Sequence, residues 1–265
     1  VYKLPAGEVF DKSFSYLSSL VSYEAKLLTS TSREYGYDDY TTIRAVTPQE
    51  WITSDPGNVG LRAVTIAWSG GAGDPNTNKL YINGGGHLDS FNNGIYVYDF
   101  SGTTAPNGFS IATGSQSTVA VASAFASLGS NWPNQYSDGR PAARHTYYGL
   151  VTFDDKVYLF GGRIAPTGNN TGDVWRYASG AWSQVATFAA EPDNCIGEFT
   201  TVFDPNTKKI AVWQSDLGKI KFFNTDTNTW GQTRTFTLGT SSIPSVHLVY
   251  DSKRSRIVVI GKVSE

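Results

Sequence analysis

A strand, an Asp-led polar turn and a second strand recur four times along this chain of 265 residues. The turn residues Asp154, Asp204 and Asp251 lie at intervals of 50 and 47 residues. A recurrence of this length is typical of four-stranded propeller blades, which bury their apolar side chains by stacking on one another. The interval from Asp74 to Asp154 is 80 residues, which indicates an insertion, placed at 101–139. The repeat therefore predicts sheets arranged about a common axis.

The domain boundaries follow from this repeat. We expect an extension over 1–61 and an all-β domain over 62–265. Within the extension, apolar residues at helical spacing predict an amphipathic helix over 12–29, which would cover one propeller face or lead into a strand of the last blade. In the first blade, the strand before the turn is expected at 63–68. The predicted blades are 62–113, 140–188, 195–238 and the partial blade 240–265.

Glycine pairs and aromatic pairs mark equivalent points of the repeat. The pairs Gly84-Gly85 and Gly161-Gly162 end second strands, and later strands carry aromatic residues: Tyr98, Tyr177 with Trp182, and Phe222 with Trp230. These features resemble the kelch-repeat family, including uncharacterised bacterial and viral members. The resemblance implies a β-propeller of roughly six or seven blades when complete, of which about three and a half are visible. We therefore expect the chain to be part of a longer polypeptide. The glycines would let the strand turn near a crowded centre, and the aromatic rings would pack between blades.

The resemblance extends to the central fold of the galactose oxidases, which are copper radical enzymes. Their site needs two histidines, two tyrosines and a cysteine joined to one of those tyrosines, and no matching motif is visible here. The single cysteine, Cys195, is interpreted as a small buried residue. Because fold alone does not confer chemistry, we expect no cofactor.

Net charge and composition indicate which classes of partner and which location the chain is suited to. The net charge is −2 and the 21 basic residues are scattered, which argues against nucleic acid. No apolar run reaches the roughly 18 residues that span a bilayer. A chain without Met, with many Ser, Thr, Gly and Asn residues, favours an extracellular, cell-surface or virion location. Its partner would be a glycan or a protein surface, and it could join a homo-oligomer or a larger assembly.

Ionisable residues gather in the loops expected at one end of the propeller. If this end is catalytic, His87 and Asp89 would be metal ligands or acid and base, and His145 would carry a proton. Arg144 would then clamp a carboxylate-bearing sugar, as in a polysaccharide-cleaving lyase or hydrolase. The alternative is that His87 and Asp89 only bond nearby backbone in a tight turn. His247, between two apolar residues, is expected to be a core histidine.

The same end is rich in side chains that suit sugar hydroxyl groups. Aromatic platforms with amide neighbours bind carbohydrate without catalysis, although polar loops with a few aromatic residues are ordinary in any propeller. An extracellular recognition module that binds glycans is the first choice, a polysaccharide-cleaving enzyme the second, and an architectural virion or surface-appendage protein the third. The candidate ligand contacts are Asn92, Asn93, Trp132, Tyr136, Tyr147 and Asn169.

Overall fold

The computed structural model describes residues 68–84, 93–100, 109–115, 117, 134–164, 170–188, 199–214, 219–235 and 246–261. The regular elements in these ranges are antiparallel strands. The first sheet contains β1 (Gly70–Asp74), β2 (Lys79–Asn83), β3 (Tyr96–Asp99) and β4 (Phe109–Ile111). The second contains β6 (Leu150–Phe153), β7 (Lys156–Phe160), β9 (Asp173–Ala178) and β10 (Ala181–Thr187). The third contains β11 (Phe199–Asp204), β12 (Lys209–Gln214), β13 (Lys219–Asn224) and β14 (Thr229–Thr235). Two smaller sheets pair β15 (Val246–Asp251) with β16 (Arg256–Gly261), and β5 (Arg144–His145) with β8 (Arg163–Ile164).

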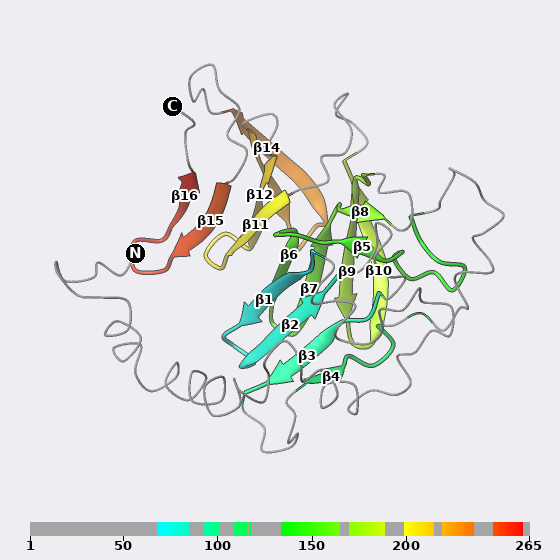
Figure 1. Cartoon of the computed structure of the whole chain (residues 1–265). Coiled ribbons are helices and arrows are strands. Elements are labelled where there is room, and N and C mark those ends of the chain that lie inside the picture. Colours follow the sequence, from blue (N-terminus) through cyan, green and yellow to red (C-terminus); the bar gives the residue numbers. More distant parts are fainter. Residues whose placement is uncertain are drawn as a thin grey trace.

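The sheets are arranged with their first strands innermost. In each four-stranded sheet the first strand forms one edge of the sheet and the last strand the other. β1 contacts β6, β6 contacts β11, and β11 contacts β15, so the first strands of successive sheets lie side by side. Figure 1 shows the sheets following one another in chain order, from cyan through green and orange to red. This is the radial arrangement of a β-propeller, and the predicted all-β propeller fold is confirmed.

Alternation along the strands gives the second and third sheets two buried faces. In the second sheet, Val151 and Tyr158 pack with residues of the third sheet, while Leu150 and Leu159 pack with residues of the first. Each pair of residues is matched across β6 and β7, and directly opposed residues project to the same face. The inner strand β6 is covered on both sides by the neighbouring sheets, which explains why all four of its residues are buried. The core therefore consists of seams between blades.

Hydrogen bonds from polar side chains connect each blade to the next, both in the outermost strands and at the hairpin turns. In the outermost strands, Trp182 donates its indole N–H to the Ser115 carbonyl at 2.9 Å, and Trp230 donates to the Thr187 carbonyl at 2.9 Å. At the Asp-Pro-Asn-Thr turns, Asn76 Nδ2 donates to Asp154 Oδ1 of the next blade at 3.1 Å. Asn206 Nδ2 likewise donates to the Tyr250 hydroxyl at 2.8 Å. The repeated sequence thus produces repeated contacts between blades.

The Gly161-Gly162 pair turns the chain beside the inner strands. Both residues have positive φ, 58° and 105°. A Cβ on Gly161 would lie 2.0 Å from an atom of the Phe199 ring, and a Cβ on Gly162 would lie 2.4 Å from the His145 carbonyl oxygen. Such distances exclude any side chain. The expectation of a sharp turn in a crowded centre is confirmed for this pair.

The structure corrects three details of the strand assignment. The strand paired with β2 is β1, Gly70–Asp74, whereas the sequence predicts it at 63–68; of those residues only Trp68 is described, and it lies in a turn. β4 falls inside the stretch 101–139 that the repeat assigns to an insertion. The ring that contacts Trp230 from the neighbouring strand is Phe223, at 5.2 Å, and not Phe222. The helix expected at 12–29 lies outside the described residues.

Candidate functional site

Five of the ten predicted site residues fall within the described ranges. Asn93, Tyr136, Arg144, His145 and Tyr147 are described. The other five lie outside the described residues: His87, Asp89, Asn92, Trp132 and Asn169. The roles given to His87 and Asp89 therefore remain predictions.

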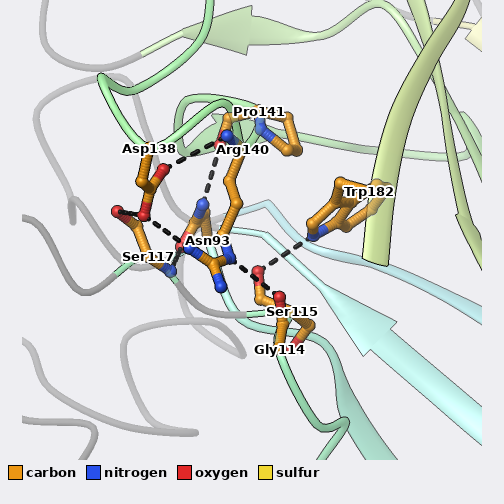
Figure 2. Close-up of polar contacts among 8 residues, drawn as sticks. All are labelled: Asn93, Gly114, Ser115, Ser117, Asp138, Arg140, Pro141 and Trp182. Atoms are coloured by element: carbon orange, nitrogen blue, oxygen red, sulfur yellow. Dashed lines mark hydrogen bonds and ion pairs between the residues drawn. The ribbon is translucent and has the colours of Figure 1, made fainter. Parts of the chain in front are cut away.

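Asn93 and Tyr136 are buried and hold the loop that ends the insertion. Asn93 Nδ2 donates to the Pro141 carbonyl at 2.8 Å, and its Oδ1 accepts from the Ser117 amide at 2.8 Å (Figure 2). The Tyr136 hydroxyl accepts from the Ala143 amide at 3.0 Å. Both side chains are 2% exposed. The structure places these predicted ligand contacts inside the scaffold that supports the loop.

Asp138 and Arg140 complete this network at its outer side. Arg140 pairs with Asp138 at 2.7 Å, and Arg140 Nε donates to the Gly114 carbonyl at 2.8 Å (Figure 2). Burial alone would raise the pKa of the Asp138 carboxyl, but hydrogen bonds from Ser117 and from Arg140, with the charge of Arg140, hold that pKa below its usual value. The network fastens the loop 134–141 to the end of the first blade.

Arg144 lies at the centre of a second buried network. Its Nη1 contacts Asp173 Oδ1 at 2.5 Å, and both side chains are 1% exposed. Nε donates to the Ala142 carbonyl and Nη2 to the Asn134 carbonyl. Asp173 also accepts hydrogen bonds from Thr171 Oγ1 at 2.8 Å and from Trp175 Nε1 at 2.6 Å. This geometry gives Arg144 a structural role and leaves its guanidinium turned away from solvent, unlike the sugar clamp that the sequence suggests.

His145 is buried beneath two aromatic rings at the start of the inner strands. It is 1% exposed, and its Nδ1 lies 3.2 Å from the Tyr147 hydroxyl. Its ring centroid lies 5.6 Å from that of Tyr147 and 6.4 Å from that of Trp68. The rings of Trp68 and Tyr147 are 6.0 Å apart, and the Tyr147 N–H donates to the Trp68 carbonyl at 3.0 Å. The three rings therefore form one cluster across the first two blades.

A second aromatic pair lies at the same end of the inner strands. The ring of Tyr148 meets that of His247 edge-on at 4.9 Å, reaching from the second blade to the fourth. The intervening third blade supports Tyr148, whose carbonyl accepts from the Thr201 amide at 3.0 Å.

His247 is exposed, so its assignment as a core histidine was wrong. The reason is strand alternation, because Val246 and Leu248 face the third blade and His247 faces the other way. We call Trp68, Tyr147, Tyr148 and His247 the aromatic row.

Two residues of this row have a left-handed backbone conformation. Trp68 has a φ of 49° and Tyr147 a φ of 46°. The left-handed region is unfavourable for bulky residues and suits turns and functional sites. Two hydrogen bonds hold the strained segment: Gly70 N–H donates to Thr146 Oγ1, and that hydroxyl donates to the Asn83 carbonyl at 2.5 Å. The surrounding blades thus fix both rings in a conformation that local preference disfavours.

Sequence reasoning identifies Tyr147 but misses the rest of the row. It places Trp68 at the end of the predicted strand 63–68 and treats Tyr148 only as the start of a strand. One signal is present: in the first two blades an aromatic residue stands at the start of the inner strand, one or two positions before a glycine, as Trp68-Ser69-Gly70 and Tyr148-Gly149. At this position the chain enters the propeller from one end, so the side chain of the aromatic residue does not pack between two blades.

Shifted pKa values at the opposite end have structural causes. Burial raises the pKa of the Tyr81 hydroxyl, and its hydrogen bond to Asp155 raises it further. Hydrogen bonds from Lys79, at 2.7 Å, and from Tyr81 lower the pKa of the Asp155 carboxyl. These contacts join the first blade to the second at their hairpin turns. Shifted pKa values there accompany blade packing and do not by themselves indicate catalysis.

Metal-ligating side chains do not gather in the described ranges. No group of three or more His, Cys, Asp and Glu side chains in these ranges is arranged to hold a metal ion. The described part of the chain also contains no helix with the length and apolarity needed to cross a membrane.

Comparison with known proteins identifies the repeat. Residues 144–189 match the family model described as the Kelch motif, a segment that begins at β5 and includes all of the second blade. Kelch repeats generally mediate protein–protein interactions. No curated protein matches the chain.

Proposed function

We propose, from the premise that this chain is a kelch-type β-propeller, that it is a recognition module that binds glycans through the aromatic row. The row lies where the inner strands of three blades begin, at the end of the propeller that also carries the loop 134–141. A rigid scaffold that presents side chains at the ends of its strands is a common design for binding sites.

The exposure of Trp68 and Tyr148 is the observation that carries this proposal. Trp68 is 66% exposed and Tyr148 is 59% exposed, more than any other large hydrophobic side chain in the described residues. By contrast, Trp175 and Trp213 are 2% and 1% exposed. Exposing large rings to water is unfavourable, and exposed apolar groups that cluster usually mark a binding surface. Strain in the backbone of Trp68 adds to this argument, since folding alone gains nothing from it.

The chemistry around these rings favours a sugar. A pyranose ring has an apolar C–H face that packs on an aromatic ring, and its hydroxyl groups need donors and acceptors at the edge. The row offers indole, phenol and imidazole edges, with the hydroxyl group of Thr201 bonded to the Tyr148 carbonyl at 2.9 Å. The row therefore presents rings that combine an apolar face with a polar edge, and sugar hydroxyl groups would form hydrogen bonds at those edges.

Removing the two exposed rings tests the proposal. Trp68→Ala and Tyr148→Ala are each expected to weaken glycan binding at least about tenfold, because each removes a stacking surface worth about 1.4 kcal/mol or more. Screening the protein on a glycan array and titrating the best ligand by calorimetry would measure this. The matched control is Phe100→Ala, which removes a 42% exposed ring beyond the end of β3.

Two outcomes would contradict the proposal. An array with no signal above background for the intact protein would reject a glycan ligand. Unchanged affinity in both row variants, with the same denaturation midpoint as the parent protein, would show that glycans bind elsewhere.

A further inference from the structure

Backbone hydrogen bonds join the starts of successive blades at the aromatic row. The Tyr147 N–H donates to the Trp68 carbonyl at 3.0 Å, from the second blade to the first. The Thr201 N–H donates to the Tyr148 carbonyl at 3.0 Å, from the third blade to the second. Backbone segments joined in this way lie about 4.7–4.9 Å apart. Each step from one blade to the next along the row is therefore close to the length of one pyranose unit in a sugar chain.

The two most exposed rings of the row lie one such step apart. Trp68 stands at the start of the first blade and Tyr148 at the start of the second, and the inner strands of these blades contact each other. His247 extends the row to the fourth blade, where its ring meets that of Tyr148 at 4.9 Å. Trp68 and Tyr148 are each more than half exposed, so they lie on an open surface. An open surface admits the interior of a sugar chain, whose ends continue past the rings on either side.

We propose that the ligand of the aromatic row is a linear oligosaccharide chain, with one sugar stacked on Trp68 and another sugar of the same chain stacked on Tyr148. This inference rests on the proposed glycan-binding function and specifies its ligand class. Once the first sugar is bound, a linked sugar meets the second ring in an intramolecular step. The affinity for a chain that reaches both rings therefore exceeds the affinity for its free monosaccharide.

Oligosaccharides of increasing length test the proposal directly. The probes are the monosaccharide, trisaccharide and hexasaccharide of the cello-, chito- and manno-oligosaccharide series, together with fragments of the same lengths from the glycan that gives the strongest array signal. Calorimetric titration of the intact protein is expected to show, in at least one series, an affinity about tenfold to a hundredfold higher for the trisaccharide than for the monosaccharide. The gain from trisaccharide to hexasaccharide should be smaller, because both rings are then already occupied.

Variants of the two exposed rings assign the gain with chain length to the row. Trp68→Ala and Tyr148→Ala should each bring the affinity for the trisaccharide close to that for the monosaccharide, because only one stacking surface remains. Tyr148→Phe keeps the ring and should retain the gain. The control is Phe100→Ala, which removes a 42% exposed ring outside the row and should leave the gain unchanged. Denaturation midpoints would confirm that each variant is folded.

The outcomes separate this inference from the function on which it rests. Equal affinities for the monosaccharide and the hexasaccharide in every series that binds would overturn the chain ligand and leave glycan binding standing. A gain with chain length that survives in both Trp68→Ala and Tyr148→Ala would likewise overturn it, because the chain would then bind away from the two rings. If neither these probes nor any glycan on an array binds the intact protein, both proposals fail.

Discussion

Replacing Arg144 by methionine is expected to lower the free energy of unfolding by about 3–5 kcal/mol. The substitution leaves the Asp173 carboxylate buried without the cation that lies 2.5 Å away, and Asp173 is 1% exposed. It also removes the donors that the carbonyl groups of Asn134 and Ala142 now use. Unfolding by guanidinium chloride, followed by tryptophan fluorescence, would measure the change.

A matched pair of variants separates burial from charge. Arg140→Met breaks an ion pair of similar length, 2.7 Å, whose side chains are 25% and 16% exposed. Because more water surrounds that pair, the expected loss is about 1 kcal/mol or less. The double variant Arg144→Met with Asp173→Asn should be less destabilised than the two single losses added together, since no charge is left unpaired. Equal losses for Arg144→Met and Arg140→Met would contradict the structural role given to Arg144.

Gly162→Ala is expected to be more damaging than Gly139→Ala or Gly73→Ala, with a loss of at least about 3 kcal/mol. Two causes act together. The φ of 105° is open only to glycine, and the added Cβ would lie 2.4 Å from the His145 carbonyl oxygen. The clash is with backbone, so it cannot be relieved by moving a side chain.

Two other glycines separate these causes. Gly139 has a φ of 82°, but no atom lies within 4 Å of the position that an added Cβ would take. Gly139→Ala should therefore cost only the backbone strain of about 1–2 kcal/mol. Gly73 has neither a positive φ nor a neighbour within 4 Å of such a Cβ, so Gly73→Ala should be neutral or slightly stabilising. Thermal unfolding of the three variants would give the order. If Gly162→Ala were as mild as Gly139→Ala, the crowded turn would be disproved.

The repeat can be predicted from the sequence because the turn residues of each hairpin favour that turn locally. The turn residues Asp154 and Asp155 both have positive φ, 49° and 58°, as a two-residue type I′ turn requires. Asp74 and Asp204 each accept a hydrogen bond from the amide two residues on, which is the local bonding that favours Asp in turns. The first inner strand is misplaced by sequence reasoning because its residues, Gly70–Asp74, are rich in glycine and resemble a turn. Pairing with β2 overrides that local preference.

The confusion of Phe222 with Phe223 has a similar origin. The register of β13 against β14 shifts between Lys221 and Phe223, which is the mark of a β-bulge or similar irregularity. A shift of one residue in the register between β13 and β14 changes which face of the sheet the next side chains of β14 share with those of β13. Trp230 therefore contacts Phe223, while Phe222 packs toward the fourth blade. No pattern in the sequence places an irregularity at this point, since neighbouring aromatic residues fit either face.

The site is less predictable than the fold because burial depends on contacts far apart in sequence. Asn93 resembles a ligand contact, yet it bonds to Pro141, 48 residues away. Arg144 resembles a clamp, yet its partner Asp173 lies 29 residues on. Trp68 is missed for the opposite reason: apolar residues near a strand are usually buried, and only the end of the propeller leaves this one exposed.

Oxidation of individual tryptophans by N-bromosuccinimide, mapped by mass spectrometry, tests most directly whether the aromatic row is the binding site. In the free protein Trp68, at 66% exposure, should be oxidised well before Trp175 and Trp213, at 2% and 1%. Saturation with the glycan that gives the strongest array signal should protect Trp68 and leave the oxidation rate of Trp230 unchanged. Equal oxidation of Trp68 with and without bound glycan would contradict the account.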